Sequence, residues 1–411
     1  MSKPFLLYQA PVATRSGYGD HARDLLKSFK DLEYYDIKIV STRWGNTPMD
    51  QLNPTDEFHQ WILNNIVTEI HQQPDVYVQL TVPNEFQTVG KFNIGVTAGI
   101  ETTIIPKDWV DGCNRMDLVI TTSNHSKSGI EGTQWTERDK DTQQILKEHR
   151  VSKPVEVLFE GTEYKELSGL DKLDSIKEDF CFLFVGHWLQ GNLYHDRKDI
   201  GGMIQTFLSA FSKSKGEKPA LILKTSSAGF SIRDREEILR KVEEVSAQVK
   251  SDVSIYLIHG DLTPDEMWKL YNHPKVKASI SFTHGEGFGR PLLEFSMTGK
   301  PIIASGWSGQ LDFLNDKQSV LLNGELKNVD PSASNQFLLQ ESQWFYVNYS
   351  NAAVKLIDVF NNYDKYLSES QKLGKENINK FSHKKMTESL KNICDRYVKV
   401  AKHVDLVLPE F

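Results

Sequence analysis

Short apolar runs that alternate with longer amphipathic patterns constrain the fold of this chain more than any other feature. Because the runs are short and the segments between them have helical periodicity, we predict buried strands joined by helices. The predicted strands of the first half are Phe5–Gln9, Ile37–Ser41, Val76–Leu80, Phe92–Thr97 and Leu118–Thr121. Those of the second half are Cys181–Gly186, Ala220–Lys224, Ser254–Ile258, Ala278–Phe282, Pro301–Ala304 and Ser319–Leu322. The predicted helices include Asp20–Phe29, Thr55–Ile66, Gly201–Phe211, Asp234–Val249, Pro264–Tyr271 and Pro291–Met297. This βαβ rhythm is typical of parallel sheets covered by helices.

Two segments interrupt the rhythm. Glu131–Lys153 is highly charged and is expected to be an exposed loop or helix, and the polar stretch Gly161–Glu178 is expected to act as part of a hinge. A chain of 411 residues is long enough for two domains. We therefore predict one α/β domain over residues 1–165 and a second over residues 166–383. Two such domains create a cleft at the carboxyl ends of their strands, where α/β proteins bind ligands.

The C-terminal segment, residues 384–411, is predicted to form a separate helical part. Lys384–His403 has helical periodicity, which gathers its apolar residues on one face. The stripe consists of Met386, Leu390, Ile393 and Tyr397. A helix of this type packs its apolar stripe against another part of the protein.

Composition and charge argue against several classes of protein. The chain is 39% hydrophobic and 25% charged, as in ordinary globular proteins. Its net charge of −7 argues against a large nucleic-acid footprint, although a local basic cleft can lie within an acidic total. No run approaches the ~20 apolar residues of a membrane span, and the start of the chain has no signal-peptide pattern. Cys113, Cys181 and Cys394 lie far apart and are predicted to be buried thiols in a reducing compartment, so we expect a cytoplasmic protein.

The strongest candidate for a ligand site is a glycine-rich loop that leads into a helix. It reads His284-Gly285-Glu286-Gly287-Phe288-Gly289-Arg290-Pro291-Leu292-Leu293-Glu294. Since Pro291 suits a first helical turn, Glu286 is expected in the loop and Glu294 about one turn into the helix. The loop amides between the two glutamates then point above the helix N-terminus, a position that favours an anion. A phosphate flanked by two carboxylates that can hold hydroxyls describes a sugar nucleotide.

With its flanking segments, this motif resembles the Glu-x7-Glu motif of retaining glycosyltransferases with the GT-B fold, especially glycosyltransferase family 4. Gly299-Lys300-Pro301-Ile302-Ile303-Ala304-Ser305 resembles the strand that follows the motif helix in that family. Phe184-Val185-Gly186, followed by Arg197-Lys198, resembles the first strand and basic site of its second domain. Ser16-Gly17-Tyr18-Gly19 resembles its N-terminal glycine loop. The resemblance implies an α/β fold of two Rossmann-like domains facing across a cleft, with the C-terminal helix crossing back to the first domain.

The resemblance also implies a role for each matching residue of the motif. Glu286 takes the place of the glutamate that contacts hydroxyls of the donor sugar, and Glu294 takes the place of the one that holds the nucleotide ribose. The backbone amides of Gly287, Phe288 and Gly289 match those that contact the donor phosphate or sugar. A helix start with surface glutamates is the alternative interpretation of these positions.

Cations of the second domain are implied to neutralise the leaving diphosphate. Lys198, preceded by Arg197, is the best match for the basic pair of the family. The family often has an arginine directly after the glycine of its first strand, but this chain has His187 there. Lys224, at the end of a predicted strand, is a further cation directed at the same cleft. Solvated positions remain the alternative for these side chains.

Four other positions complete the predicted site. Gly17 and Gly19 are expected near the donor phosphate and the acceptor, unless they are ordinary turn glycines. Glu101 follows a strand at the position where related enzymes reach the sugar, often with a histidine, and it is either the replacement or a structural glutamate. Leu262 follows a strand at the height where family members hold the nucleotide base through backbone groups.

The resemblance implies a reaction that needs no metal and no separate cofactor. A nucleotide sugar, expected to be a UDP- or GDP-sugar, serves as co-substrate, and the fixed cations stabilise the charge that develops on the diphosphate. In this family the donor phosphate is thought to take the proton of the acceptor during front-face attack, with retention. The Asp-x-Asp sequence Asp139-Lys140-Asp141 lies in a run of charges and is interpreted as solvated surface, so we assign no metal ligands.

Several functions stay open at this point. The leading hypothesis is a retaining glycosyltransferase with a soluble acceptor: a saccharide, a protein or a small metabolite. The predicted first helix mixes acidic and basic residues, so it has no basic face for a membrane. The alternatives are transfer to a modified base in DNA, a non-catalytic nucleotide-sugar-binding protein, and an epimerase or phosphorylase on the same architecture. The sequence does not indicate an oligomeric state.

Overall fold

The apolar runs of the first half form one parallel sheet. In the computed structural model, which describes residues 3–167, 169–214, 216–227 and 229–399, its strand order is β2-β1-β3-β4-β5-β8. The strands are β1 (Phe5–Ala10), β2 (Asp36–Ser41), β3 (Val76–Leu80), β4 (Phe92–Thr97), β5 (Leu118–Thr121) and β8 (Val155–Val157). The connecting helices are α1 (Gly17–Leu32), α2 (Glu57–Asn65), α3 (Lys107–Arg115) and α4 (Asn124–Gly132). Every residue of β3 is buried, as expected for a parallel strand with both faces covered.

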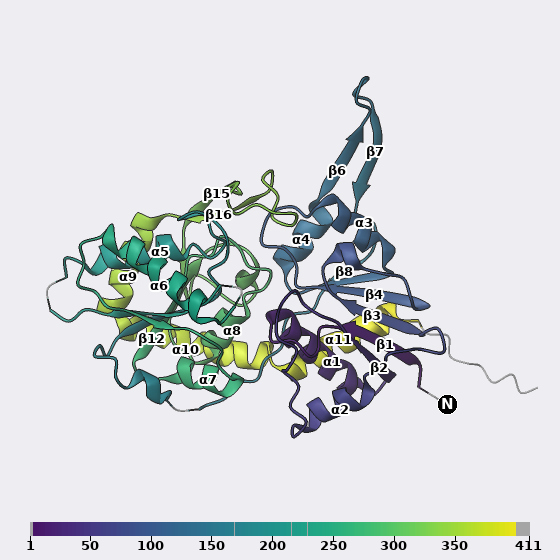
Figure 1. Ribbon diagram of the computed structural model, residues 1–411, viewed down its shortest axis with the longest axis horizontal. Coiled ribbons are helices and arrows are strands. Elements are labelled where there is room, and N and C mark those ends of the chain that lie inside the picture. The colour runs from purple at the N-terminus through teal and green to yellow at the C-terminus, as the bar shows by residue number, and fades with distance from the viewer. Residues whose placement is uncertain (1–2, 168, 215, 228, 400–411) are drawn as a thin grey trace, which may run out of the picture.

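The second half forms another parallel sheet, with the order β11-β10-β9-β12-β13-β14. Its strands are β9 (Cys181–Val185), β10 (Ala220–Lys224), β11 (Ile255–Ile258), β12 (Val276–Ser281), β13 (Ile302–Ser305) and β14 (Val320–Leu322). Its helices are α5 (Ile200–Phe211), α6 (Ile232–Ala247), α7 (Pro264–Asn272), α8 (Arg290–Met297), α9 (Tyr349–Asn361) and α10 (Tyr363–Lys380). Counted along the chain, the order is the doubly wound 3-2-1-4-5-6, whose switch point lies between β9 and β12. The two sheets lie side by side as separate units (Figure 1).

The predicted α/β fold is confirmed. The first and last residues of each predicted strand lie within two residues of those of an observed strand. Side-chain caps explain why the helices begin where they do. Ser16 caps α1 and Ser123 caps α4, each by accepting a backbone N–H of the first turn. Thr263 and Glu266 form a reciprocal capping box at the start of α7.

The prediction for Glu131–Lys153 was wrong in its secondary structure. The segment is exposed, but it forms an antiparallel hairpin of β6 (Gln134–Arg138) and β7 (Ile145–Arg150), which projects from the first unit (Figure 1). Polar and charged residues at most positions hide the alternation, because only the root of the hairpin is packed. There the Trp135 indole donates to the Ile105 carbonyl at 3.0 Å, and the buried His149 lies 3.3 Å from Asp111.

A second hairpin, which the sequence did not reveal, joins the two units. It consists of β15 (Gly324–Asn328) and β16 (Gln343–Val347), and it belongs to the second unit. The amide of Gln343 donates to the Thr103 hydroxyl at 3.0 Å, and the amide of Thr103 donates to the Gln343 carbonyl at 2.9 Å. In the connection between its strands, Phe337 packs on Trp109 with ring centroids 5.6 Å apart.

The C-terminal helix α11 (His383–Tyr397) crosses back to the first unit, where it packs beside α1 (Figure 1). Met386, Leu390 and Ile393 of the predicted stripe are buried in the core of that unit, and Tyr397 packs against it. The Thr387 hydroxyl lies 3.1 Å from that of Ser28 on α1. The helix was predicted to extend to His403, but residues 400–411 lie outside the described part of the chain.

Candidate active site

The glycine-rich loop lies between the two units, because its glycines approach the backbone of the first unit. A Cβ on Gly285 would lie 1.9 Å from the Glu101 carbonyl oxygen, and one on Gly287 would lie 2.2 Å from that of Ala98. Only glycine fits such contacts. The Ser123 hydroxyl of α4 also donates to the Gly287 carbonyl. The loop is therefore the place where the carboxyl ends of β4 and β12 meet.

The loop presents unpaired donors at the start of α8. Gly289 caps the helix with a left-handed backbone, φ 95°, and Pro291 occupies its first turn. Within the described residues, the amides of Gly287, Phe288 and Gly289 have no hydrogen-bond acceptor. Together with the helix dipole, these three N–H groups form a site that favours an anion.

Two cations stand beside the loop and are both paired with Glu286. Lys198 forms an ion pair with one carboxylate oxygen of Glu286, and the Arg197 Nη1 lies 3.2 Å from the other. The same Arg197 nitrogen lies 3.5 Å from Glu101 of the first unit. Predicted residues from both units thus meet in one cluster whose two positive and two negative charges balance.

Burial and the opposing charges shift the pKa values in this cluster. Burial alone would raise the pKa of Glu286, but Lys198 and Arg197 hold it below its ordinary value. Burial lowers the pKa of Lys198, and Glu286 only partly compensates. Glu286 is therefore ionised, and its carboxylate already pairs with both of the cations that an anionic ligand would bind. A bound diphosphate has to share these cations with Glu286 or displace it.

Glu294 lies on α8 in a second charged network. Its carboxylate accepts from the Arg290 Nε at 2.9 Å and from the Tyr271 hydroxyl at 3.3 Å. Arg290 also pairs with Asp24 of α1, and its Nη1 lies 4.0 Å from Glu160. Sequence reasoning missed Arg290 and Asp24. Arg290 stands inside the motif, but nothing in the sequence connects it with a residue so far away on the first helix.

The remaining predicted residues lie outside these two networks, and they differ in whether they are hydrogen-bonded, packed or next to open space. The Lys224 ammonium donates to the Gly260 carbonyl at 2.8 Å, and Leu262 packs against the core of the second unit. Gly17 has open space beside it. The amide of Gly19 is already used, since it donates to the Ser16 hydroxyl at 3.0 Å. Gly19 is required for another reason as well, because a Cβ there would lie 2.3 Å from the Thr14 carbonyl oxygen.

His187, which stands where the family often has arginine, is held as a neutral side chain. Its Nδ1 lies 3.2 Å from the Ser226 hydroxyl. Burial lowers its pKa, and the nearby Lys198, Lys224 and Arg197 lower it further. His187 can therefore offer a hydrogen bond in this site, but it adds no positive charge at neutral pH.

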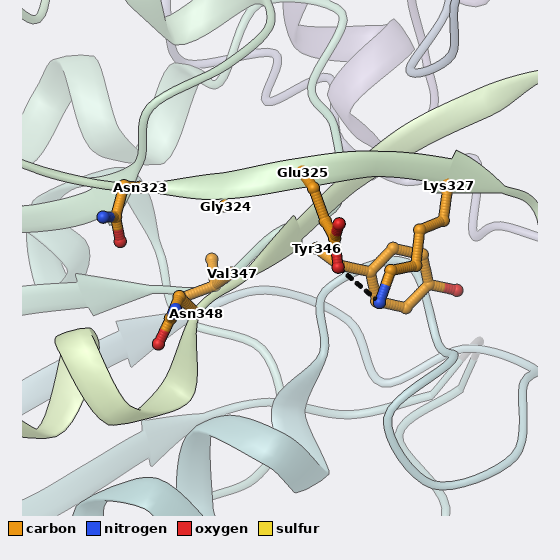
Figure 2. Close-up of a pocket in the computed structure, with 7 residues that line it drawn as sticks. All are labelled: Asn323, Gly324, Glu325, Lys327, Tyr346, Val347 and Asn348. Atoms are coloured by element: carbon orange, nitrogen blue, oxygen red, sulfur yellow. Dashed lines mark ion pairs between the residues drawn. The ribbon is translucent and has the colours of Figure 1, made fainter.

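Two other features of the sequence analysis lie outside this cluster. Asp139-Lys140-Asp141 is at the exposed tip of the β6–β7 hairpin, which agrees with its interpretation as solvated surface. A pocket of about 330 Å³ lies on the β15–β16 hairpin and is lined by Asn323, Gly324, Glu325, Lys327, Tyr346, Val347 and Asn348 (Figure 2). It contains none of the predicted site residues, and its recorded ring contact with the motif joins Tyr346 and His284, with centroids 4.2 Å apart. We therefore place the site in the loop cluster rather than in this pocket.

Ionisation of the buried Glu160 carboxyl near Arg290 is expected to destabilise the protein at alkaline pH. Burial raises the pKa of Glu160 to about 8, opposed by Arg290 and reinforced by Asp24, Asp20 and Glu294. A carboxyl whose pKa is raised in the folded protein stabilises it fully below the unfolded value of 4.5, and this stabilisation is lost as the pH rises through about 8. The melting temperature should therefore be several degrees lower at about pH 9 than at about pH 6. Glu160→Gln should reduce this difference, and an unchanged pH dependence would contradict the assignment.

Comparison with known proteins identifies the fold of the chain but no sequence family. No family model matches the chain, and no curated protein matches its sequence. A sucrose-phosphate synthase from Thermosynechococcus elongatus has a similar structure, with a TM-score of 0.62, 12% identity and coverage of 96% of this chain and 98% of that one. A glycosyltransferase from Rickettsia africae gives a TM-score of 0.63 and 14% identity over 97% and 100%. HepE from Anabaena, in complex with UDP and glucose, has a TM-score of 0.58 and 10% identity, with coverage of 95% of this chain and 99% of that one.

These similarities extend over nearly the full length of every chain compared. Together with the two parallel six-stranded sheets, they show that the chain has the GT-B fold, with two Rossmann-like domains. At identities of 10–14% they establish the fold alone. None of the helices in the described residues is long and apolar enough to cross a membrane.

Proposed function

We propose that this protein is a glycosyltransferase of the family 4 type, which moves a sugar from a nucleotide-sugar donor to an acceptor hydroxyl. The observation that carries the proposal is the cluster of Glu286, Arg197 and Lys198 beside three unpaired loop amides, at the switch point of the second sheet. An anion site with adjacent carboxylates suits a molecule that combines phosphates with hydroxyls. The structure of HepE with UDP and glucose supports a UDP-sugar as the first donor to test.

The donor is proposed to span the two charged networks. Its diphosphate lies at the amides of Gly287, Phe288 and Gly289 and draws Lys198 and Arg197 away from Glu286. The released Glu286 carboxylate then accepts hydrogen bonds from hydroxyls of the sugar. This exchange of one anion for another leaves no buried cation without a partner.

The proposed reaction breaks one bond and forms one. The oxygen of the acceptor hydroxyl bonds to the anomeric carbon, and the bond from that carbon to the donor phosphate breaks with its electron pair remaining on phosphate oxygen. The acceptor proton passes to the diphosphate, on the same face, which gives retention. Arg197 and Lys198 stabilise the charge that develops on the leaving group, so we propose that no metal and no further cofactor take part.

The acceptor side of the proposal is broader. Charge and helix patterns favour a soluble saccharide, protein or metabolite over a modified base in DNA. The three free cysteines are buried, which fits the proposed cytoplasmic location. A protein that only binds nucleotide sugars would not need Glu101 from the first unit at the Arg197 cluster. This contact favours an enzyme.

The donor can be identified by thermal shift with UDP-, GDP-, ADP- and TDP-sugars, since a ligand stabilises the folded protein by mass action. The stabilising donor is then incubated without acceptor, and its hydrolysis is measured. Release of the nucleoside diphosphate supports the enzyme. Binding that persists with no hydrolysis, and with no transfer to any acceptor, would leave a nucleotide-sugar-binding protein instead.

Glu294→Ala is expected to weaken nucleotide binding by about tenfold or more, with little change in sugar preference, because charged hydrogen bonds to the ribose hydroxyls are lost. The affinity for UDP and for the free sugar can be measured separately by calorimetry. Glu244→Ala is a matched control, since Glu244 forms an i,i+4 pair with Arg240 on α6 but is exposed. An unaltered nucleotide affinity in Glu294→Ala would show that the ribose assignment is wrong.

A further inference from the structure

A stacked aromatic pair in the first unit has no assigned role. The rings of Trp44 and Tyr18 lie 3.7 Å apart between centroids, with an angle of 14° between their planes. Both side chains are half-buried. Among the described residues, Tyr18 is the only ring that contacts Trp44, and Trp44 does not pack against any of the apolar clusters of the core. One face of the indole is therefore occupied by Tyr18, and no ring or core cluster covers the other.

The loop that carries Trp44 holds the indole in a defined position. The amide and the hydroxyl of Thr47 donate to the Trp44 carbonyl at 3.1 and 2.7 Å, and Gly45 between them has a left-handed backbone, φ 50°. The amide of Arg15 donates to the Pro48 carbonyl at 2.9 Å. These bonds fix the backbone of the turn against the segment after β1, and the stacking on Tyr18 positions the ring itself, so the aromatic pair is ordered before a ligand binds.

The aromatic pair lies close to two contacts between the units. The Tyr18 hydroxyl lies 3.3 Å from that of Thr97, the last residue of β4. The next residue, Ala98, is the one whose carbonyl closely approaches Gly287. On the other side, the Arg15 Nη1 lies 3.2 Å from Asp261 of the second unit. The pair thus stands between two contacts that join the units, on the side of the cleft opposite the proposed donor site.

We propose that Trp44, supported by Tyr18, is the acceptor subsite and that it holds the ring of a neutral saccharide. This inference rests on the proposed function and narrows its acceptor. The apolar C–H face of a pyranose can pack on an indole, while the hydroxyls at its edge remain free to bond and react. A nucleobase can also stack on tryptophan, but a nucleic acid needs free cations for its phosphates. Arg15 is already paired with both Asp50, at 2.9 Å, and Asp261. The exposed Arg43, next to Trp44 in the chain, has no ion-pair partner among the described residues, but a single cation is a small footprint for a phosphate backbone.

Binding and transfer are measured separately to test the subsite. Saturation-transfer NMR follows the binding of maltose and methyl α-glucoside in the presence of UDP, and transfer is followed from the donor found by thermal shift. Trp44→Ala is expected to weaken saccharide binding about tenfold and to lower the ratio of transfer to donor hydrolysis by a similar factor. Trp44→Phe, which keeps a ring, should retain part of both. Trp61→Ala is the matched control, since Trp61 is also half-buried and stacks on Phe58 in the same unit, and it should behave as wild type.

The outcomes separate the subsite from the function. Saccharide binding that depends on Trp44, without any transfer, supports the subsite and contradicts the glycosyltransferase. Transfer to saccharides that is equally efficient in Trp44→Ala supports the enzyme and overturns the subsite. Transfer to a DNA duplex, with no binding of either saccharide, overturns the neutral acceptor, and absence of both binding and transfer overturns both proposals.

Discussion

Lys198→Ala is expected to lower turnover by ~100-fold or more, because it removes a fixed cation that stabilises the developing charge of the leaving diphosphate. Lys198 is buried, with 8% of its surface exposed, so its ammonium acts on the leaving group with little screening by solvent. The loss should appear in kcat more than in donor affinity, since the charge on the leaving oxygen grows toward the transition state. Single-turnover measurements with saturating donor give this quantity directly.

Two further variants show whether a loss of turnover reflects the chemistry. Lys198→Arg keeps the charge with a different shape and should recover part of the rate. Lys218→Ala removes a lysine that pairs with Asp252 outside the site, and it should leave turnover unchanged. Because Lys198→Ala also leaves Glu286 with Arg197 as its remaining ion-pair partner, the melting temperature must be compared. Near-normal turnover in a folded Lys198→Ala protein would refute the role of Lys198.

The second unit could be predicted well from the sequence because its signals are local. A glycine loop, a proline in the first helical turn and an apolar run on each side determine where β12 ends and where α8 begins. The basic pair Arg197-Lys198 directly precedes α5, whose cap Asp199 is the next residue. Parallel strands then bring these segments to the same edge of the sheet, so the predicted neighbours meet.

The partners of the site residues could not be predicted in the same way. Arg290 pairs with Asp24, a residue that is 266 positions away and that looks like one charge among several on an amphipathic helix. The pairing of Glu286 with both cations is likewise a product of packing, since the sequence places these side chains on separate segments. The β6–β7 hairpin and strand β15 escaped prediction because most of their side chains are exposed, which removes the apolar alternation that marks a buried strand. Strand β16 is mostly buried, but its partner β15 carries no matching apolar signal in the sequence.

Because Gly285 and Gly287 contact the backbone of the first unit, substituting either glycine tests whether the reaction needs the two units to close on each other. The carbonyl of Ala98 lies where a Cβ on Gly287 would be, and a Gly285 Cβ would meet the carbonyl of Glu101 in the same way. Both obstacles are backbone atoms, which cannot swing aside as a side chain does. A methyl group at either position must therefore push the loop away from β4 or hold the two units apart, and a displacement of about 1 Å in an active site can cost ~100-fold in rate.

Gly287→Ala is accordingly expected to lower transfer by ~100-fold or more while the protein stays folded and still binds UDP, because the proposed nucleotide contacts belong to the second unit. The rate, the UDP affinity and the melting temperature are measured together, and small-angle scattering should show a more open molecule in the variant. Gly132→Ala is the control, since Gly132 ends α4 and has no atom within 4 Å of the position of a Cβ. Normal transfer by Gly287→Ala would mean that the reacting enzyme does not bring Ala98 and Gly287 together. Loss of transfer together with loss of UDP binding would instead place the methyl group in the donor site itself.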